Sequence, residues 1–313
     1  MTTPYVLEPH WANWMLAVEM FVAGLAAGIF FFIALANTTG RKEDREVGAI
    51  LGFFPAPLML IAAILLTVDL GQPGRFLNLI FTSPAATERP GPFMLNPNSP
   101  MNWGTYVILV FGALTVIPFL DALRHTGRLP FARGLVETLA HDPVGMFVCA
   151  ALALATGSYS GVLLNVTNLP VWSDTYLQGA LYVTFSALGG FAAAGIVADR
   201  LRAHETAGAV RTGLMGISLI AAVLLALYIG NLVALGTAGP LVTTMVYLVA
   251  PSFWIGAVGL AVLLPLVVVT TGARLRLARV DVSSLAVLGM LVLIGVFAFR
   301  WSIMHSALAA LGH

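Results

Sequence analysis

The feature that most constrains this chain is a series of eight apolar runs, each long enough to cross a lipid bilayer as a helix. The hydrocarbon core of a bilayer is about 30 Å thick and takes about 20 helical residues. Long continuous runs predict helices rather than the short alternating strands of a barrel. The sequence therefore predicts an all-α integral membrane protein with eight transmembrane helices. The runs lie at residues 12–37, 48–70, 103–123, 144–165, 177–198, 212–235, 243–271 and 284–306.

Composition and charge support a lipid environment. Of the 313 residues, 59% are hydrophobic and 9% are charged, whereas soluble domains carry about 25% charged residues. The net charge is +1, which argues against a nucleic-acid partner. Residues 1–10 lack the basic segment of a cleaved signal peptide, so we expect the first helix to be retained.

The basic residues between the apolar runs predict the orientation of the chain. The first, third, fifth and seventh connections hold twelve of them, whereas the even connections hold only Arg75 and Arg89. Connections rich in Lys and Arg stay in the cytoplasm. We therefore expect a multi-pass protein of the bacterial cytoplasmic (inner) membrane with its N- and C-termini outside.

Two similar segments suggest an internal repeat. Residues 23–28 read Ala-Gly-Leu-Ala-Ala-Gly, and residues 189–195 read Gly-Gly-Phe-Ala-Ala-Ala-Gly. One interpretation is a single membrane domain over 1–313 with a four-helix bundle at 12–165 and a second at 177–306. The other is that small residues only mark close helix contacts.

Five polar residues lie in the outer half of the predicted helices. Ionisable groups in hydrocarbon are costly and are functional candidates by default. Together they predict one polar patch that suits the head group of a lipid-tailed quinone. Tyr159 can donate a hydrogen bond to the ring, and Glu19 can exchange protons. The predicted quinone-binding residues are Glu19, Asp69, Tyr159, Asn231 and Arg300.

Each of these residues also has a structural interpretation. Glu19 could form an ion pair with Arg300, and Tyr159 could belong to the aromatic belt at the membrane interface. Asp69 could pair with Arg75 to shape the following loop. Asn231 is better explained as structural than as a ligand.

The sequence offers no redox centre of its own. Cys149 is the single cysteine, and an iron–sulfur cluster needs about four. None of the six histidines lies in the middle of a predicted helix, so haem held by two histidines is not expected. No Cys/His cluster suggests a metal site.

Several segments resemble the NrfD/PsrC family of integral membrane subunits from polysulfide-reductase-type complexes. Pro-Gly-Arg-Phe and Ser-Pro-Met-Asn-Trp-Gly, which flank the second loop, are the more specific of them. The similar segments are 24–28, 69–76, 99–104, 157–165, 170–172 and 253–256.

The resemblance implies a haem-free site for menaquinone or ubiquinone near the outer face. It also implies an extracytoplasmic iron–sulfur subunit and a molybdopterin catalytic subunit as partners. Tyr159 matches a tyrosine that lines the site in the family. Glu19 stands where polysulfide-type members can have histidine, and Leu16 stands where they have asparagine, which argues against assigning polysulfide as substrate.

We therefore predict a quinone-binding subunit that exchanges electrons with an extracytoplasmic oxidoreductase. Glu19 and Tyr159 are its expected catalytic residues. Arg75, Trp103 and Trp172 are expected at the partner interface, over loops 71–102 and 166–176. The alternatives are a proton- or ion-translocating subunit and a passive membrane anchor.

Overall fold

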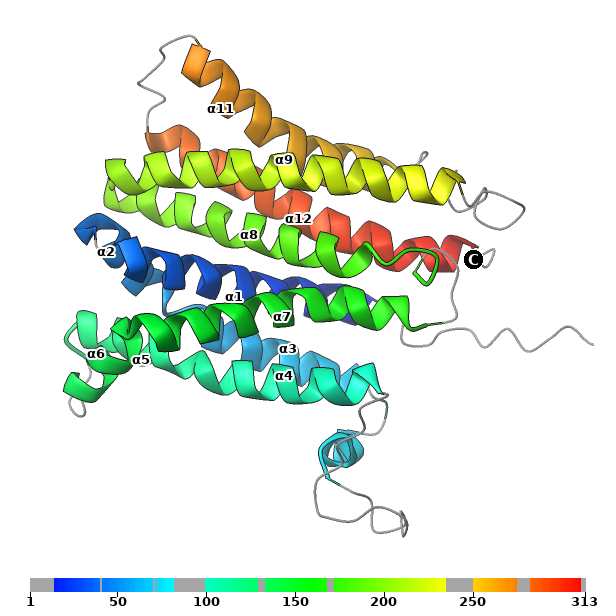
Figure 1. Cartoon of the computed structure of the whole chain (residues 1–313), viewed down its shortest axis with the longest axis horizontal. Coiled ribbons are helices and arrows are strands. Elements are labelled where there is room, and N and C mark those ends of the chain that lie inside the picture. The colour runs from blue at the N-terminus through cyan, green and yellow to red at the C-terminus, as the bar shows by residue number, and fades with distance from the viewer. Residues whose placement is uncertain are drawn as a thin grey trace, which may run out of the picture.

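The structure is a layered bundle of long helices (Figure 1). This computed structural model describes residues 14–39, 41–69, 71, 73–81, 99–128, 133–167, 172–234, 250–274 and 282–310. The helices are α1 (Trp14–Thr39), α2 (Lys42–Leu51), α3 (Pro55–Asp69), η1 (Pro73–Leu79), α4 (Pro100–Leu114), α5 (Val116–His125), α6 (Arg133–His141), α7 (Pro143–Asn165), α8 (Gln178–Leu201), α9 (His204–Ala234), η2 (Ser252–Leu263), α11 (Leu264–Arg274) and α12 (Val282–Ala310).

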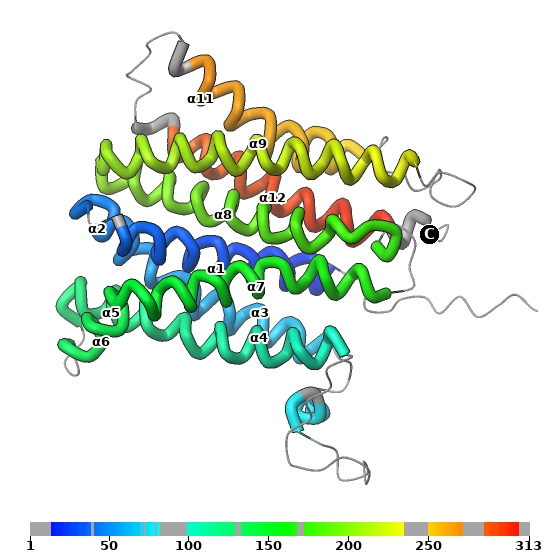
Figure 2. Tube along the Cα trace, viewed as in Figure 1, coloured from blue at the N-terminus to red at the C-terminus, as the bar shows by residue number. Residues whose placement is uncertain are grey.

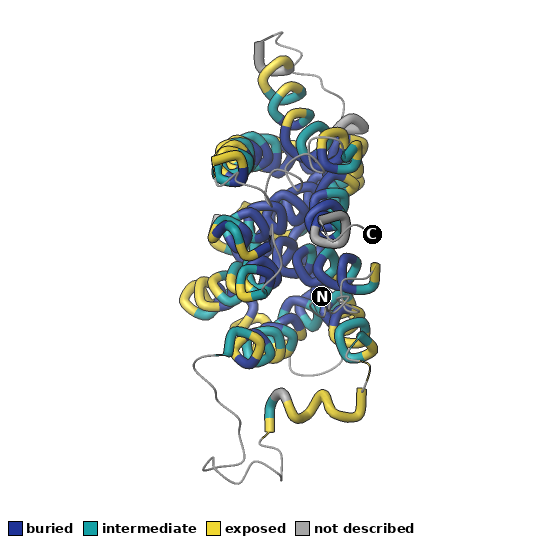
Figure 3. The backbone as a smooth tube through the Cα atoms, turned by 90° about the vertical axis from the view of Figure 1, so that its right-hand side faces the viewer, coloured by how far each residue is buried: buried dark blue, intermediate teal, exposed yellow. Residues whose placement is uncertain are grey.

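Eight helical segments are long and apolar enough to span a membrane, which confirms the predicted fold class. The second span joins α2 to α3, the third joins α4 to α5, and the seventh joins η2 to α11. Large apolar side chains on the outer faces are exposed, among them Leu60, Phe147 and Ile255. Buried residues lie between the helices when the bundle is viewed end-on (Figure 3).

Prolines and caps explain where several helices begin. Pro55 and Pro100 each open a helix, at a position where the missing N–H costs nothing. The Ser99 hydroxyl accepts a hydrogen bond from the Asn102 N–H at 3.3 Å, and the Asp142 carboxylate accepts one from the Gly145 N–H at 2.6 Å. These are side-chain N-caps, which satisfy donors that a helix start leaves unpaired.

The two ends of the bundle differ in charge. The terminal end, on the right of Figure 1, holds the start of α1 and the end of α12. The opposite end, which we call the basic end, is where α1 leads into α2 and α8 leads into α9. The basic residues there include Arg41, Lys42, Arg45, Arg124, Arg200 and Arg202.

The helices α1 and α8 run in the same direction and lie side by side (Figure 2), and two glycines lie where they approach most closely. A Cβ atom added at Gly28 would overlap the backbone of α8, and one added at Gly190 would overlap the backbone of α1. Glycine is therefore required at both positions for the two backbones to approach this closely. Both glycines belong to the segments that suggested an internal repeat.

Contacts between α1 and α8 join residues that are 162 positions apart. The Tyr182 hydroxyl lies 3.7 Å from the Met20 sulfur, and the same separation relates Gly28 to Gly190. At the basic end, the Thr206 hydroxyl donates to Asp44 at 2.7 Å, again across 162 positions. Two helices that pack side by side in the same direction keep such a constant separation, so these contacts fix the register between α1 and α8.

A second pair of similar segments lies in α3 and α9. Residues 60–66 read Leu-Ile-Ala-Ala-Ile-Leu-Leu, and residues 219–225 read Leu-Ile-Ala-Ala-Val-Leu-Leu. These segments are 159 positions apart, so they do not share the register of the contacts between α1 and α8. Because α1 and α8 pack extensively on each other, the helices form one continuous core, and the division into two four-helix bundles stays a prediction.

The crossing of α1 and α8 generates a prediction about stability. Replacing Gly190 by Leu should destabilise the chain by more than about 3 kcal/mol, the upper end of the usual cost of overpacking, because backbone rather than a side chain is in the way. The measurement is denaturant unfolding of the purified chain in detergent. Gly216→Leu is the matched control, since a Cβ at Gly216 meets no atom within 4 Å. Equal effects of the two substitutions would contradict the close crossing.

Candidate functional site

Glu19 of α1 is a buried carboxylic acid near the terminal end. Only 5% of the residue is exposed, and its carboxyl group makes no hydrogen bond to any residue that the structure describes. It interacts electrostatically with Arg300, Asp69 and Tyr159, which belong to three other helices. The structure therefore brings four of the five predicted polar residues into one neighbourhood.

Arg300 of α12 is fully buried beside this carboxyl group. Its Nε donates to the Met20 carbonyl at 2.8 Å, and its Nη2 donates to the Ser186 hydroxyl at 2.7 Å. The guanidinium carbon lies 5.2 Å from the centre of the Tyr182 ring, a cation–π distance. The remaining nitrogen, Nη1, has no hydrogen-bond partner among the residues that the structure describes. Arg300 is thus anchored from two sides, with both N–H groups of Nη1 left over.

Glu19 and Arg300 do not form the direct ion pair that was one interpretation of the sequence. The two groups interact electrostatically, but no nitrogen–oxygen distance between them is within 4.0 Å. Neither group therefore satisfies the hydrogen-bonding capacity of the other. A buried carboxyl group and a buried guanidinium donor, both without a full set of partners, are costly in an apolar interior.

Small residues make room for Arg300 between α1 and α8. A Cβ atom added at Gly24 of α1 would overlap the Arg300 guanidinium, and the Ser186 hydroxyl of α8 accepts its hydrogen bond. A glycine at position 24 is therefore required for the guanidinium to lie between these two helices.

Tyr159 of α7 faces α4. A Cβ atom added at Gly104 would overlap the Tyr159 ring, so this glycine makes the space that the ring occupies. The hydroxyl donates to the Met101 carbonyl at 3.5 Å, a long hydrogen bond that a better acceptor could replace. Tyr159 is also close enough to Glu19 for the two groups to interact electrostatically.

The other residues predicted around the mouth lie at different depths. Asp69 ends α3, is partly buried and interacts electrostatically with Glu19. Arg75 is exposed on η1, which lies beside the packed helices rather than among them (Figure 3). Trp103 of α4 is 45% exposed. Most of the loop expected to dock a partner, residues 82–98, is outside the described residues.

Trp172 and Asn231 lie in the second half of the chain. Trp172 is fully buried, and its indole N–H donates to the Ile303 carbonyl at 2.8 Å. The expectation that its side chain faces a partner is therefore wrong, because α12 supplies the partner that a buried indole N–H needs. The Asn231 amide donates to the Asp174 carbonyl at 3.3 Å. Since α8 lies between α1 and α9 (Figure 1), Asn231 is not grouped with Glu19.

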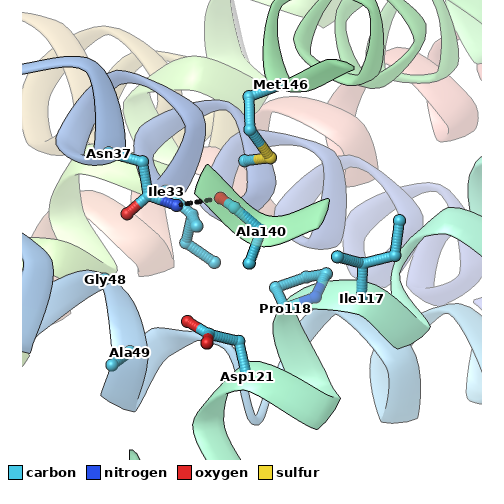
Figure 4. A pocket seen from close by; sticks show the side chains of 9 residues that line it. All are labelled: Ile33, Asn37, Gly48, Ala49, Ile117, Pro118, Asp121, Ala140 and Met146. Carbon is cyan, nitrogen blue, oxygen red and sulfur yellow. Dashed lines mark hydrogen bonds between the residues drawn. The ribbon is translucent and has the colours of Figure 1, made fainter. Parts of the chain in front are cut away.

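Buried carboxylates also occur at the basic end. Asp44 accepts the Thr206 hydrogen bond, and Asp121 accepts one from Arg124 Nε at 2.8 Å. Figure 4 shows Asp121 facing a small pocket that Asn37 also lines. Both carboxylates have protein partners, so they are explained by structure, whereas Glu19 is not.

Sequence reasoning missed Ser186 and Gly104. Ser186 is a small polar residue near the middle of an apolar helix, whereas the predicted candidates were all ionisable or large polar residues. Gly104 was quoted only as part of a motif. Nothing in that motif indicates that the ring of Tyr159, from another helix, would occupy the space beside this glycine.

Comparison with known proteins agrees with this architecture. The family model described as "Polysulphide reductase, NrfD" matches residues 7–312. No curated protein matched the chain. Among the residues that the structure describes, no three His, Cys, Asp or Glu side chains are grouped so that they could hold a metal ion.

The contact between Gly104 and Tyr159 can be tested by a double-mutant cycle. Gly104→Ala should lower the free energy of unfolding by about 1–3 kcal/mol, the usual cost of overpacking. The loss should be much smaller in a chain that also carries Tyr159→Ala, because the overlapping ring is gone. Gly112→Ala in the same helix is the control and should not destabilise, since its Cβ has open space. If Gly104→Ala is as harmless as the control, the ring does not occupy this gap.

Proposed function

Because the chain belongs to the polysulphide reductase, NrfD family, we propose that it binds a membrane quinone at its terminal end and exchanges electrons with an extracytoplasmic oxidoreductase. The observation that carries the proposal is the buried Glu19 carboxyl group, which makes no hydrogen bond within the described part of the chain, near the Arg300 Nη1, which likewise has no partner there. A ligand with hydrogen-bonding oxygens and an apolar ring fits such a site better than a purely structural role does.

Each residue of the cluster has a part in this proposal. The Tyr159 hydroxyl donates to a carbonyl oxygen of the quinone, in place of its long bond to Met101. Glu19 accepts the two protons of the quinol one after the other as its electrons leave, passing the first on before it takes the second, and the steps reverse in the opposite direction. Arg300 stabilises the negative charge that Glu19 carries before it accepts each proton. Asp69, at the end of α3, passes the proton towards the terminal end.

The electron partner is proposed to be an iron–sulfur subunit outside the cytoplasm, attached to a molybdopterin catalytic subunit. The site lies near the terminal end, and the positive-inside rule assigns the opposite, basic end to the cytoplasm. Electrons would pass directly between the quinone and the partner, with menaquinone or ubiquinone as the substrate.

The arrangement of polar groups favours this function over proton translocation. Glu19 and Asn37 are eighteen residues apart on α1, which is about 27 Å along a helix. The buried face of α1 between them is lined by apolar side chains such as Ala26, Phe30 and Ile33. A polar path from the site to the basic end would have to cross this segment. A passive anchor would have no use for an unbonded buried carboxyl group.

The proposed orientation can be tested with cysteines placed at opposite ends of the bundle. In a Cys149→Ala background, Asn78→Cys on η1 should react with a membrane-impermeant maleimide in cells whose outer layers have been made permeable. Lys42→Cys at the basic end should react only after the cytoplasmic membrane is opened. The reverse pattern would place the termini and the polar cluster on the cytoplasmic side.

The role of Glu19 can be tested by replacing its carboxyl group with an amide of the same shape. Glu19→Gln should lower quinone-linked turnover of the assembled complex by at least a hundredfold, the lower end of the usual contribution of a general base. Assembly should persist. Asp121→Asn is the matched control, because it changes a buried carboxylate outside the site. Normal turnover of the Glu19→Gln complex would remove Glu19 from the mechanism.

A further inference from the structure

An apolar groove of about 530 Å³ opens between the second and third spans. One wall is formed by α3, from Ala56 to Ala63, and the other runs from Ile108 on α4 to Phe119 on α5. Thr115 is the one polar residue among those that line it. The wall from Ile108 to Phe119 is about 17 Å long at 1.5 Å per residue.

The groove leads towards the polar cluster on both walls. Ile108 lies one helical turn, about 6 Å, from Gly104, against which Tyr159 packs. Ala63 lies six residues, about 9 Å, from Asp69. A molecule with its polar head between Glu19 and Tyr159 could thus continue into the groove without leaving the surface of the protein.

We propose that this groove binds the polyprenyl tail of the quinone, an inference that rests on the proposed function. The groove has the chemistry of a hydrocarbon-binding surface and the length for several isoprene units. Both of its walls end within about two helical turns of the residues of the proposed head-group site, which distinguishes it from ordinary lipid-facing surface that any acyl chain would cover. The tail therefore contributes to binding, and the site selects long-tailed quinones over tail-less ones.

Gly112 is the position at which the groove can be filled without disturbing the fold. It lines the groove, and a Cβ atom added there meets no atom within 4 Å. A Gly112→Phe side chain can therefore extend into the groove instead of clashing with the helices. Gly216 on α9 has the same open surroundings on the other half of the chain, so Gly216→Phe is the matched control.

The experiment compares two quinol substrates in the assembled complex, one without a tail and one with four isoprene units. In Gly112→Phe the KM for the long-tailed quinol should rise about tenfold, which corresponds to about 1.4 kcal/mol of lost binding. The KM for the tail-less quinol should stay within twofold, and Gly216→Phe should change neither value. As a second measurement, a photoreactive group on the tail should label α3 or α4 in the wild-type complex.

The outcomes separate the groove from the head-group site. An unchanged KM for the long-tailed quinol in Gly112→Phe, an equal fold-change for both quinols, or tail labelling confined to other helices would overturn the groove and leave the proposed function standing. A groove filled by an ordinary lipid chain or by a partner's helix would give that result. Absence of quinone-linked turnover in the wild-type complex would instead refute the proposed function.

Discussion

The close crossing of α1 and α8 is the contact on which the rest of the structure depends. Glycines at 28 and 190 let the two backbones touch, and this contact fixes the register between α1 and α8. One turn away, Gly24 and Ser186 leave the space that the Arg300 guanidinium occupies. Without this approach the guanidinium could not lie beside Glu19. Helix packing through small residues thus creates the electrostatics of the site.

The polar residues of the proposed site come mostly from the first part of the chain. Glu19 lies on α1, Asp69 on α3 and Tyr159 on α7, and α12 contributes Arg300. The apolar groove between the second and third spans is formed by the same part of the chain. The head-group and tail-binding surfaces that we propose therefore share the walls of α3 and α4.

The fold could be predicted from the sequence because lipid imposes simple rules on length and composition. The eight apolar runs and the patch around Glu19, Tyr159 and Arg300 followed from those rules. The partners of each polar group could not be predicted, because they depend on how helices rotate against one another. The sequence predicted Trp172 at the partner interface, whereas its indole N–H donates a hydrogen bond to the Ile303 carbonyl. Asn231 shares the depth of Glu19 but lies on the far side of α8.

The central claim is that the Glu19 carboxyl group, which makes no hydrogen bond to any residue that the structure describes, is available to bind a quinone. Infrared difference spectroscopy of the purified chain in lipid, with and without added quinone, tests this directly. We predict that quinone binding shifts a carboxyl stretching band, that Glu19→Gln abolishes this band, and that Asp121→Asn leaves it unchanged. A difference spectrum that is identical in wild type and Glu19→Gln would show that the quinone binds elsewhere, and would contradict the account.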